Sequence, residues 1–281
     1  MTLEDAFQCI GLNCLEQMEA NVPGVLTQSV ESLHQMRVGL RRLRAALDMF
    51  SKLAPLPGDM RKGVDWLAGE LGATRDWDVL VTSTLAKMTV ADSAELRKLA
   101  AAKAHELHKV LLISLSDPRY TQLLLQLNGW FHGRHWRNRV NFMKHSPLAT
   151  RISQSMNPLL RKAQKRMIRR IKAADKSDPV ALHGIRIAAK KARYAAEFFS
   201  DVLPKRAVKQ YISGLSQLQD RLGNLNDLEV AKRLLIEIEG AAQPGAAVFA
   251  LGYLSCELHA SIQDLSKTLG SKQSHKMPLH K

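Results

Sequence analysis

Two stretches of this chain place a histidine and several cations at the spacing of one helix face. In the first, basic residues follow a histidine by three, seven, eight and ten positions: His34, Arg37, Arg41, Arg42 and Arg44. The second has basic residues at the same offsets: His183, Arg186, Lys190, Lys191 and Arg193. Guanidinium and ammonium groups acting together donate several charge-assisted hydrogen bonds to phosphate oxygens. The residue types and their spacing therefore predict the binding of a polyanion.

Each stretch must form an amphipathic helix if its cations are to act together. At about 100° per residue, the histidine and the cations at +3, +7 and +10 fall within an arc of roughly 80°, and the cation at +8 lies to one side. In the first stretch the neighbouring arc is apolar: Leu33, Met36, Leu40, Leu43, Leu47 and Phe50. No acid interrupts the two stripes before Asp48 and Glu197, whereas a solvated helix usually alternates both signs. Such a face repels itself unless an anion lies along it.

The spacing alone leaves other interpretations of the stripes open. A solvated face is one alternative, and an internal network of ion pairs with nearby acids is another: Asp76, Asp78, Asp227 and Glu229. A magnesium site made of these acids is disfavoured, because residues two apart on a helix diverge. We expect the acids to lie at helix starts or to orient the arginines. We expect the histidines to be neutral, since neighbouring cations disfavour protonation, and anion binding to tighten on mild acidification.

The sequence predicts no catalytic residue, no metal site and no cofactor. The pairs His105/His108 and His132/His135 have a spacing that one helix face could offer to a metal, but neither has a third ligand nearby. We find no Ser/His/Asp or Cys/His arrangement and no Gly-rich phosphate loop. We therefore expect a binding protein. The alternatives are a nucleic-acid-binding protein and a metal-dependent enzyme that acts on phosphates.

The charge of the whole chain also favours a polyanionic partner. Its 281 residues include 41 Lys or Arg against 26 Asp or Glu, a formal net charge of +15. No acid occurs between Asp117 and Asp175, where a further basic helix offers additional anion contacts: Arg161, Lys165, Arg166 and Arg169. A nucleic acid would fit this charge too, but aromatic residues are few near the stripes. We expect the central aromatic residues to pack in the core or to anchor the linker: Trp130, Phe131 and Trp136.

Helices are the only regular elements that the sequence predicts, since no strand pattern of period two occurs. We expect them over residues 3–19, 29–53, 59–71, 76–88, 91–116, 119–131, 148–174, 178–202, 205–222, 227–238 and 246–269. The stretch Asn21-Val22-Pro23-Gly24 would end or interrupt the first helix, and Gly72 would follow the end of the third. Residues 271–281 are expected to form a loose tail.

The order of these elements recurs in the two halves of the chain. The first basic helix is followed by Leu71-Gly72-Ala73-Thr74-Arg75-Asp76-Trp77-Asp78, and the second by Leu222-Gly223-Asn224-Leu225-Asn226-Asp227-Leu228-Glu229. Both segments keep Leu-Gly, an aspartate four residues after the glycine, and a second acid two residues later. We therefore predict one domain, residues 1–270, made of two related helical bundles at about 1–135 and 147–270.

This duplicated pattern resembles the conserved histidine α-helical domain, the CHAD family. The resemblance covers residues 3–265 and includes Asp117-Pro118-Arg119-Tyr120 and Lys191-Ala192-Arg193-Tyr194. It implies an all-α fold of two pseudo-symmetric four-helix bundles, with a basic groove or channel between them that binds inorganic polyphosphate. The implied contacts are the ten residues of the two stripes. The lysines of the second stripe keep the charge of the arginines in the first, but they lose the bidentate geometry.

We expect a cytoplasmic protein, with polyphosphate granules as the further location that the resemblance suggests. The three cysteines form no CxxC motif and no even framework, so they are interpreted as reduced thiols. No apolar run reaches the length needed to cross a bilayer, and Met1–Asp5 lacks the basic start of a signal peptide. The oligomeric state does not follow from the sequence.

Overall fold

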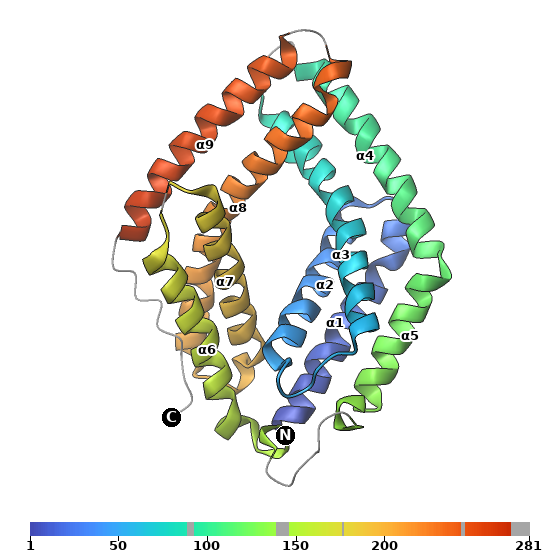
Figure 1. Cartoon of the computed structure of the whole chain (residues 1–281), viewed down its shortest axis with the longest axis vertical. Helices are drawn as coiled ribbons and strands as arrows, with labels where there is room; N and C mark the ends of the chain where they lie inside the picture. Colours follow the sequence, from blue (N-terminus) through green and yellow to red (C-terminus); the bar gives the residue numbers. More distant parts are fainter. Residues whose placement is uncertain (89–92, 139–145, 176, 243–244, 271–281) are drawn as a thin grey trace.

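The computed structural model describes residues 1–88, 93–138, 146–175, 177–242 and 245–270. Their regular structure is helical, as predicted (Figure 1), apart from an isolated bridge between Thr2 and Arg151. The long helices of these residues are α1 (Leu3–Leu26), α2 (Val30–Phe50), α3 (Gly58–Val79), α4 (Ser93–Ser116), α5 (Pro118–His132), α6 (Ile152–Ala173), α7 (Pro179–Phe198), α8 (Lys205–Ile238) and α9 (Ala246–Gly270). None of them combines the length and the apolar character needed to cross a bilayer.

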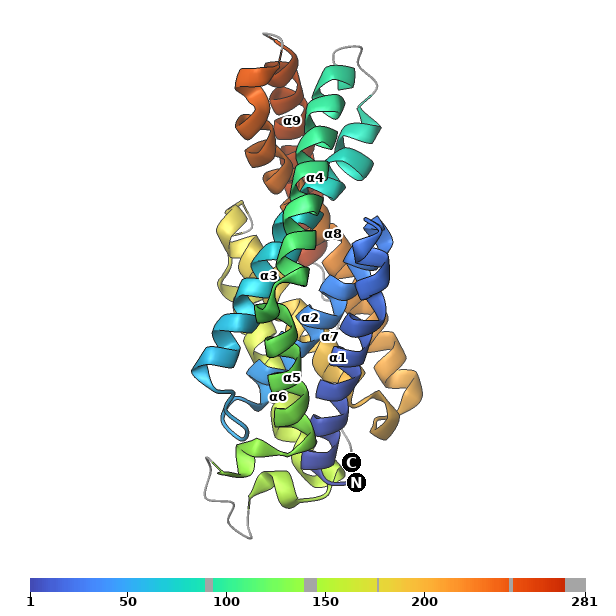
Figure 2. The same ribbon diagram turned by 90° about the vertical axis from the view of Figure 1, so that its right-hand side faces the viewer.

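The helices of the two halves pack in a similar order. In the first half α1 packs on α2, α2 on α3 and α3 on α4; in the second, α6 packs on α7, α7 on α8 and α8 on α9. The two halves meet at several places: α2 contacts α7, α3 contacts α8, α1 contacts α6, and α4 contacts α8 and α9 (Figures 1 and 2). The buried apolar side chains form one cluster that extends through both halves. The division into two bundles stays a prediction, and the predicted tail lies outside the described residues.

Aromatic rings fill the core of the first half. Phe7 of α1 stacks on Phe50 of α2 with 4.4 Å between ring centroids. The other rings around Phe7 come from the middle of the chain: Trp130, Phe131 and Trp136. All of these side chains are buried. The prediction that the central aromatic residues pack in the core is therefore confirmed.

The buried carboxylate of Glu4 fastens the start of the link between the halves to α1. It accepts hydrogen bonds from Trp136 Nε1 and Arg137 Nε, each at 2.8 Å. Arg134 Nη1 donates a further bond at 3.0 Å. Burial alone would raise the pKa of this carboxyl, but the hydrogen bonds from Arg137 and Trp136 and the nearby positive charges outweigh burial and lower the pKa.

The predicted helix breaks at two glycines are wrong. α3 continues through Gly72, and α8 continues through Gly223. Neither glycine has a positive φ, so neither acts as a left-handed cap. Asp76 and Asp227 consequently lie inside helices, and the prediction that they lie at helix starts is wrong as well. α1 likewise continues through Pro23.

Other helix starts follow their sequence signals. Asp178 caps α7 by accepting hydrogen bonds from the backbone N–H groups of Val180 and Ala181 at 2.9 and 3.1 Å. Pro179 occupies the first position of this helix, where its missing N–H costs no hydrogen bond. The second basic helix therefore begins where the sequence predicts.

Candidate anion-binding site

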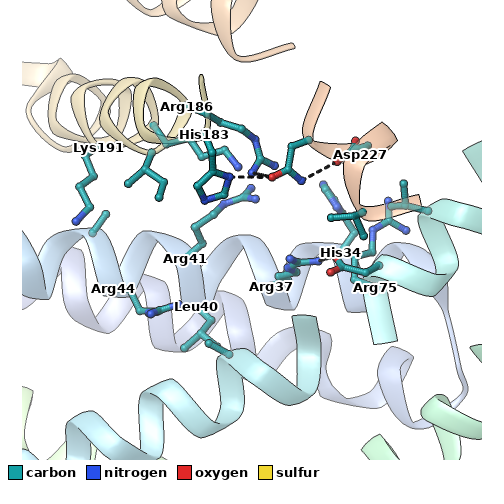
Figure 3. Close-up of a pocket in the computed structure, with 18 of the residues that line it drawn as sticks. His34, Arg37, Leu40, Arg41, Arg44, Arg75, His183, Arg186, Lys191 and Asp227 are labelled. Atoms are coloured by element: carbon teal, nitrogen blue, oxygen red, sulfur yellow. Dashed lines mark hydrogen bonds and ion pairs between the residues drawn. The ribbon is translucent and has the colours of Figure 1, made fainter. Parts of the chain in front are cut away.

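The two basic helices face a common cavity of about 730 Å³ (Figure 3). The apolar arc of α2 is buried in the core, as the helical spacing predicts: Leu33, Met36, Leu40, Leu43, Leu47 and Phe50. α7 buries a corresponding arc: Leu182, Ile185, Ala188, Ala189 and Ala192. Because these arcs fix the rotation of each helix, the cationic arcs turn towards the space between α2 and α7. Residues of α3 and α8 complete the cavity wall.

The cavity brings together eight of the ten side chains predicted as ligands. From α2 they are His34, Arg37, Arg41 and Arg44, and from α7 they are His183, Arg186, Lys190 and Lys191. Figure 3 shows side chains of the two helices directed into the same space. Residues about 150 positions apart in the chain thus share one site, an arrangement that the spacing within each stripe does not reveal.

Arg42 and Arg193 lie outside this cavity wall. Arg42 Nη1 donates a hydrogen bond to Gln17 Oε1 of α1 at 3.3 Å. Arg193 pairs with Glu197, one turn further along α7, at 3.5 Å. On α2 the cation ten positions after the histidine, Arg44, therefore lines the cavity. On α7 the cation eight positions after the histidine, Lys191, lines it instead. The two halves are not symmetric in detail.

The four cations predicted on the third basic helix also lie outside the cavity. They are exposed on α6: Arg161, Lys165, Arg166 and Arg169. α6 packs against α7 at the lower left of Figure 1, and none of its side chains lines the cavity. Any contact that these four make with an anion must therefore occur on the outer surface.

Some cavity residues were not singled out by the sequence patterns. Three are cations: Arg61, Arg75 and Arg233. Arg75 and Asn226 occupy the same position in the two Leu-Gly segments, one residue before the aspartate. Asn226 Oδ1 accepts a hydrogen bond from Arg186 Nη1 at 2.9 Å and lies 3.1 Å from His183 Nδ1. The repeat of the Leu-Gly segment marks both positions in the sequence. Because the segment has the pattern of a helix end, however, the sequence does not predict the helix face on which these two residues lie.

Among the residues that the structure describes, two hydrogen bonds join the helices of the two halves at the cavity. Lys191 Nζ of α7 donates to Asp48 Oδ2 of α2 at 2.5 Å. Arg41 Nε of α2 donates to the hydroxyl of Tyr194 of α7 at 2.7 Å. The Lys191–Asp48 ion pair offsets one positive charge of the cavity wall, and both contacts join α2 to α7.

The predicted acids have two different roles. Asp76 Oδ1 accepts a hydrogen bond from Arg37 Nη1 at 3.0 Å, so it orients a cavity arginine, as predicted. Asp78 instead lies in the core, 3.0 Å from His108 Nε2. His105 lies next to Gln28. Within the described ranges, no three His, Cys, Asp or Glu side chains are grouped so that they could hold a metal ion.

Three cavity cations or potential cations have no hydrogen-bond or ion-pair partner among the described residues: His34, Arg75 and Lys190. Burial, followed by the charges of neighbouring arginines, lowers the pKa of Lys190 from 10.5 to about 7. Burial and then the charge of Arg75 lower the pKa of His34 from its ordinary value. Burial and the charges around the cavity therefore disfavour further positive charge, and an anion placed in the cavity would oppose both shifts.

Comparisons with known proteins agree with this architecture. The family model for the CHAD domain matches residues 9–236. The crystal structure of the CHAD domain from the plant Ricinus communis is 33% identical in sequence and has a TM-score of 0.88, covering 100% of this chain and 95% of that chain. PptA from Streptomyces chartreusis shares the fold at 16% identity, with a TM-score of 0.67 over 96% of this chain and 98% of that chain. The comparison with curated proteins gives no significant match. Because the family model matches most of the sequence, the chain belongs to the CHAD domain family.

Proposed function

We propose that this protein binds inorganic polyphosphate in the cavity between α2 and α7 and performs no chemistry on it. The observation that carries the proposal is the excess of positive charge in the cavity. Nine arginine or lysine side chains line it against three aspartates, and this excess favours an anionic ligand, which would also favour the charged form of Lys190. The resemblance of the duplicated histidine-arginine stripes to the CHAD pattern supports the same ligand.

The extent of the stripes favours a chain of phosphates over a single phosphate. His34 and Arg44 are ten residues apart on α2, which corresponds to about 15 Å along the helix axis. The α7 stripe lines the same cavity. A flexible linear polyanion can contact successive cations on both helices, whereas one phosphate can reach only a few of them.

We propose that the first phosphates bind at the cavity donors that have no hydrogen-bond acceptor. Arg75 Nη1 and Arg186 Nε are buried without a hydrogen-bond acceptor, so phosphate oxygens would satisfy them. The planar guanidinium groups can donate bidentate bonds, and Lys190 adds a point charge. The negative charge of the ligand favours the protonated forms of Lys190 and His34, so binding takes up protons. Salt should weaken the complex steeply, by analogy with counterion release from nucleic acids.

The test compares two double variants that remove the same charge from the same two helices. Arg37→Gln/Arg186→Gln removes cations of the cavity wall, and Arg42→Gln/Arg193→Gln removes cations outside it. Each charge-assisted hydrogen-bonding group contributes about 1.5–3 kcal/mol, so the first variant should bind labelled polyphosphate roughly 100-fold more weakly or worse. The second should bind within a few-fold of the wild type.

The same titration distinguishes the alternatives. Equal losses in both double variants would mean that general charge, and not the cavity, binds the ligand. DNA or RNA that displaces labelled polyphosphate as well as unlabelled polyphosphate does would favour a nucleic-acid-binding protein. Magnesium-dependent release of phosphate would favour an enzyme.

A further inference from the structure

The charged side chains of α6 are all positive. Seven of its basic side chains are exposed: Arg161, Lys162, Lys165, Arg166, Arg169, Arg170 and Lys172. We call them the α6 basic face. α6 contains no acidic residue, and none of the seven forms an ion pair with any described residue. At 1.5 Å per residue, the face extends for about 16 Å along the helix.

The α6 basic face begins close to the cavity. Arg170 lies against Gly184 of α7, where a Cβ would be only 2.4 Å from Arg170 Nη1. Gly184 directly follows His183, which lines the cavity. The lack of a side chain at Gly184 therefore lets the guanidinium of Arg170 approach α7 beside the cavity wall. Cations continue from there along α6, with Arg166 one turn away from Arg170.

We propose that the α6 basic face is a second polyphosphate-binding surface, which holds the part of a long chain that extends beyond the cavity. This inference rests on the proposed function, because it concerns the same ligand. A face of like charges repels itself unless anions lie along it, and Arg170 brings one end of this face to Gly184, the residue after His183 of the cavity wall. Since the chain is already held in the cavity, its outer part is present at α6 at a high effective concentration. Affinity should therefore increase with chain length beyond what the cavity can hold.

The experiment uses two probes and two matched variants of the full chain. The α6 variant carries Arg161→Gln, Lys165→Gln, Arg166→Gln and Arg169→Gln; it leaves Arg170 in place because that side chain packs on α7. The control removes four charges from exposed residues of α4 and α8 instead: Lys98→Gln, Lys109→Gln, Lys205→Gln and Arg206→Gln. Glutamine has nearly the helix propensity of lysine and arginine, so both variants should fold, which circular dichroism can verify.

The expected result is a reduction in affinity that depends on chain length. The α6 variant should bind long-chain polyphosphate about tenfold more weakly or worse, and tripolyphosphate within twofold of the wild type. For the long chain, the slope of the logarithm of the binding constant against the logarithm of the salt concentration should become shallower. The expected change is roughly 0.7–0.9 for each phosphate that the variant no longer neutralises. The control should keep both affinities and the steeper salt dependence.

Two results would overturn the inference while leaving the proposed function intact. One is an unchanged affinity of the α6 variant for the long chain, and the other is an equal reduction for both probes. If the α6 variant no longer bound duplex DNA but kept long-chain polyphosphate, the face would belong to a nucleic acid. Failure of the wild type to bind either polyphosphate would instead refute the proposed function itself.

Discussion

Lys190 and Arg41 occupy the same position of the two stripes, seven residues after the histidine, but they respond differently to burial. An arginine stays charged in a protein. Burial lowers the pKa of Lys190 from 10.5 to about 7, assisted by the charges of three cavity arginines: Arg186, Arg41 and Arg37. The charge of Asp227 opposes this shift. The second stripe thus contains a cation whose protonation depends on what fills the cavity.

Replacing Lys190 with methionine should stabilise the ligand-free protein and weaken polyphosphate binding. The pKa of this lysine is about 7 in the folded state and 10.5 in the ordinary, unfolded reference, so the unfolded state binds more protons between these values. The contribution of Lys190 to wild-type stability is therefore lowest below pH 7 and rises as the pH increases towards 10.5. In thermal unfolding, Lys190→Met should have the higher Tm below pH 7, and the difference should narrow at alkaline pH.

An exposed lysine provides the control for this prediction. Lys209→Met on α8 should change the Tm by a similar small amount at every pH. With polyphosphate present, wild type should gain more Tm than Lys190→Met, because the anion favours the charged lysine. A ligand-free Lys190→Met that is less stable than wild type below pH 7 would contradict the assignment.

At the same scale, the sequence predicts most of the Lys, Arg and His side chains of the cavity but not the difference between the two halves. Helical geometry places the residues at +3 and +7 on the face that lines the cavity in both halves. It also places the cation at +10 on this face and the cation at +8 to one side. α2 follows this geometry, because Arg44 lines the cavity and Arg42 does not. α7 departs from it, because Lys191 lines the cavity and Arg193 does not.

At the scale of the helix, Gly72 and Gly223 show how a local signal can be overridden. Both have the leucine-glycine pattern of a helix end, yet α3 and α8 continue. Apolar residues on both sides of each glycine are buried in the core, and this packing outweighs a glycine's weak preference. Gly72 has a further role, because Arg37 Nη1 donates a hydrogen bond to its carbonyl oxygen at 3.4 Å. The Leu-Gly pattern marks the repeat in the sequence, but it does not predict that both segments lie inside continuous helices.

Replacing Gly223 with alanine should therefore stabilise the protein. A Cβ at Gly223 would meet no atom within 4 Å, and the backbone there is helical. Alanine should raise the free energy of unfolding by about 0.5–1 kcal/mol, measured by chemical denaturation, because it restricts the unfolded chain. At a left-handed helix cap the same change would destabilise, so the sign of the effect decides whether α8 is continuous.

A second helical glycine should respond in the opposite direction. A Cβ at Gly11 of α1 would lie 2.1 Å from Cε1 of Phe131, whose ring is packed against Phe7 and Trp130. Gly11→Ala should lower the free energy of unfolding by about 1–3 kcal/mol, as expected for overpacking of a core. A similar decrease in both variants would show that α8 is interrupted near Gly223.

At the scale of the whole molecule, the start of α1 holds both described ends of the link between the halves. Glu4 binds the link at Arg137, soon after α5. At the other end, the backbone N–H of Leu3 donates to Thr150 O at 3.0 Å. The N–H of Ile152 donates to Met1 O at 3.3 Å. No helical spacing in the sequence indicates these contacts, because their partners are more than 130 residues apart. The sequence therefore does not predict the contacts that hold the described ends of the link to α1.

Glu4→Gln should loosen this attachment in a way that depends on pH. The hydrogen bonds and charges around Glu4 lower its pKa below 4.5 despite burial, so its stabilising effect is present above that value and is lost as the pH falls through the folded-state pKa. Near neutral pH the variant should lose about 2–3 kcal/mol of unfolding free energy, since hydrogen bonds to a charged group are replaced by weaker ones to an amide.

Glu16→Gln, an exposed change on the same helix, should stay within about 0.5 kcal/mol of the wild type. Denaturation series at decreasing pH should show the gap between wild type and Glu4→Gln closing as Glu4 becomes protonated. If that gap stayed constant into strongly acidic solution, the effect of the substitution would come from packing, and the charge of Glu4 would not be what attaches the link to α1.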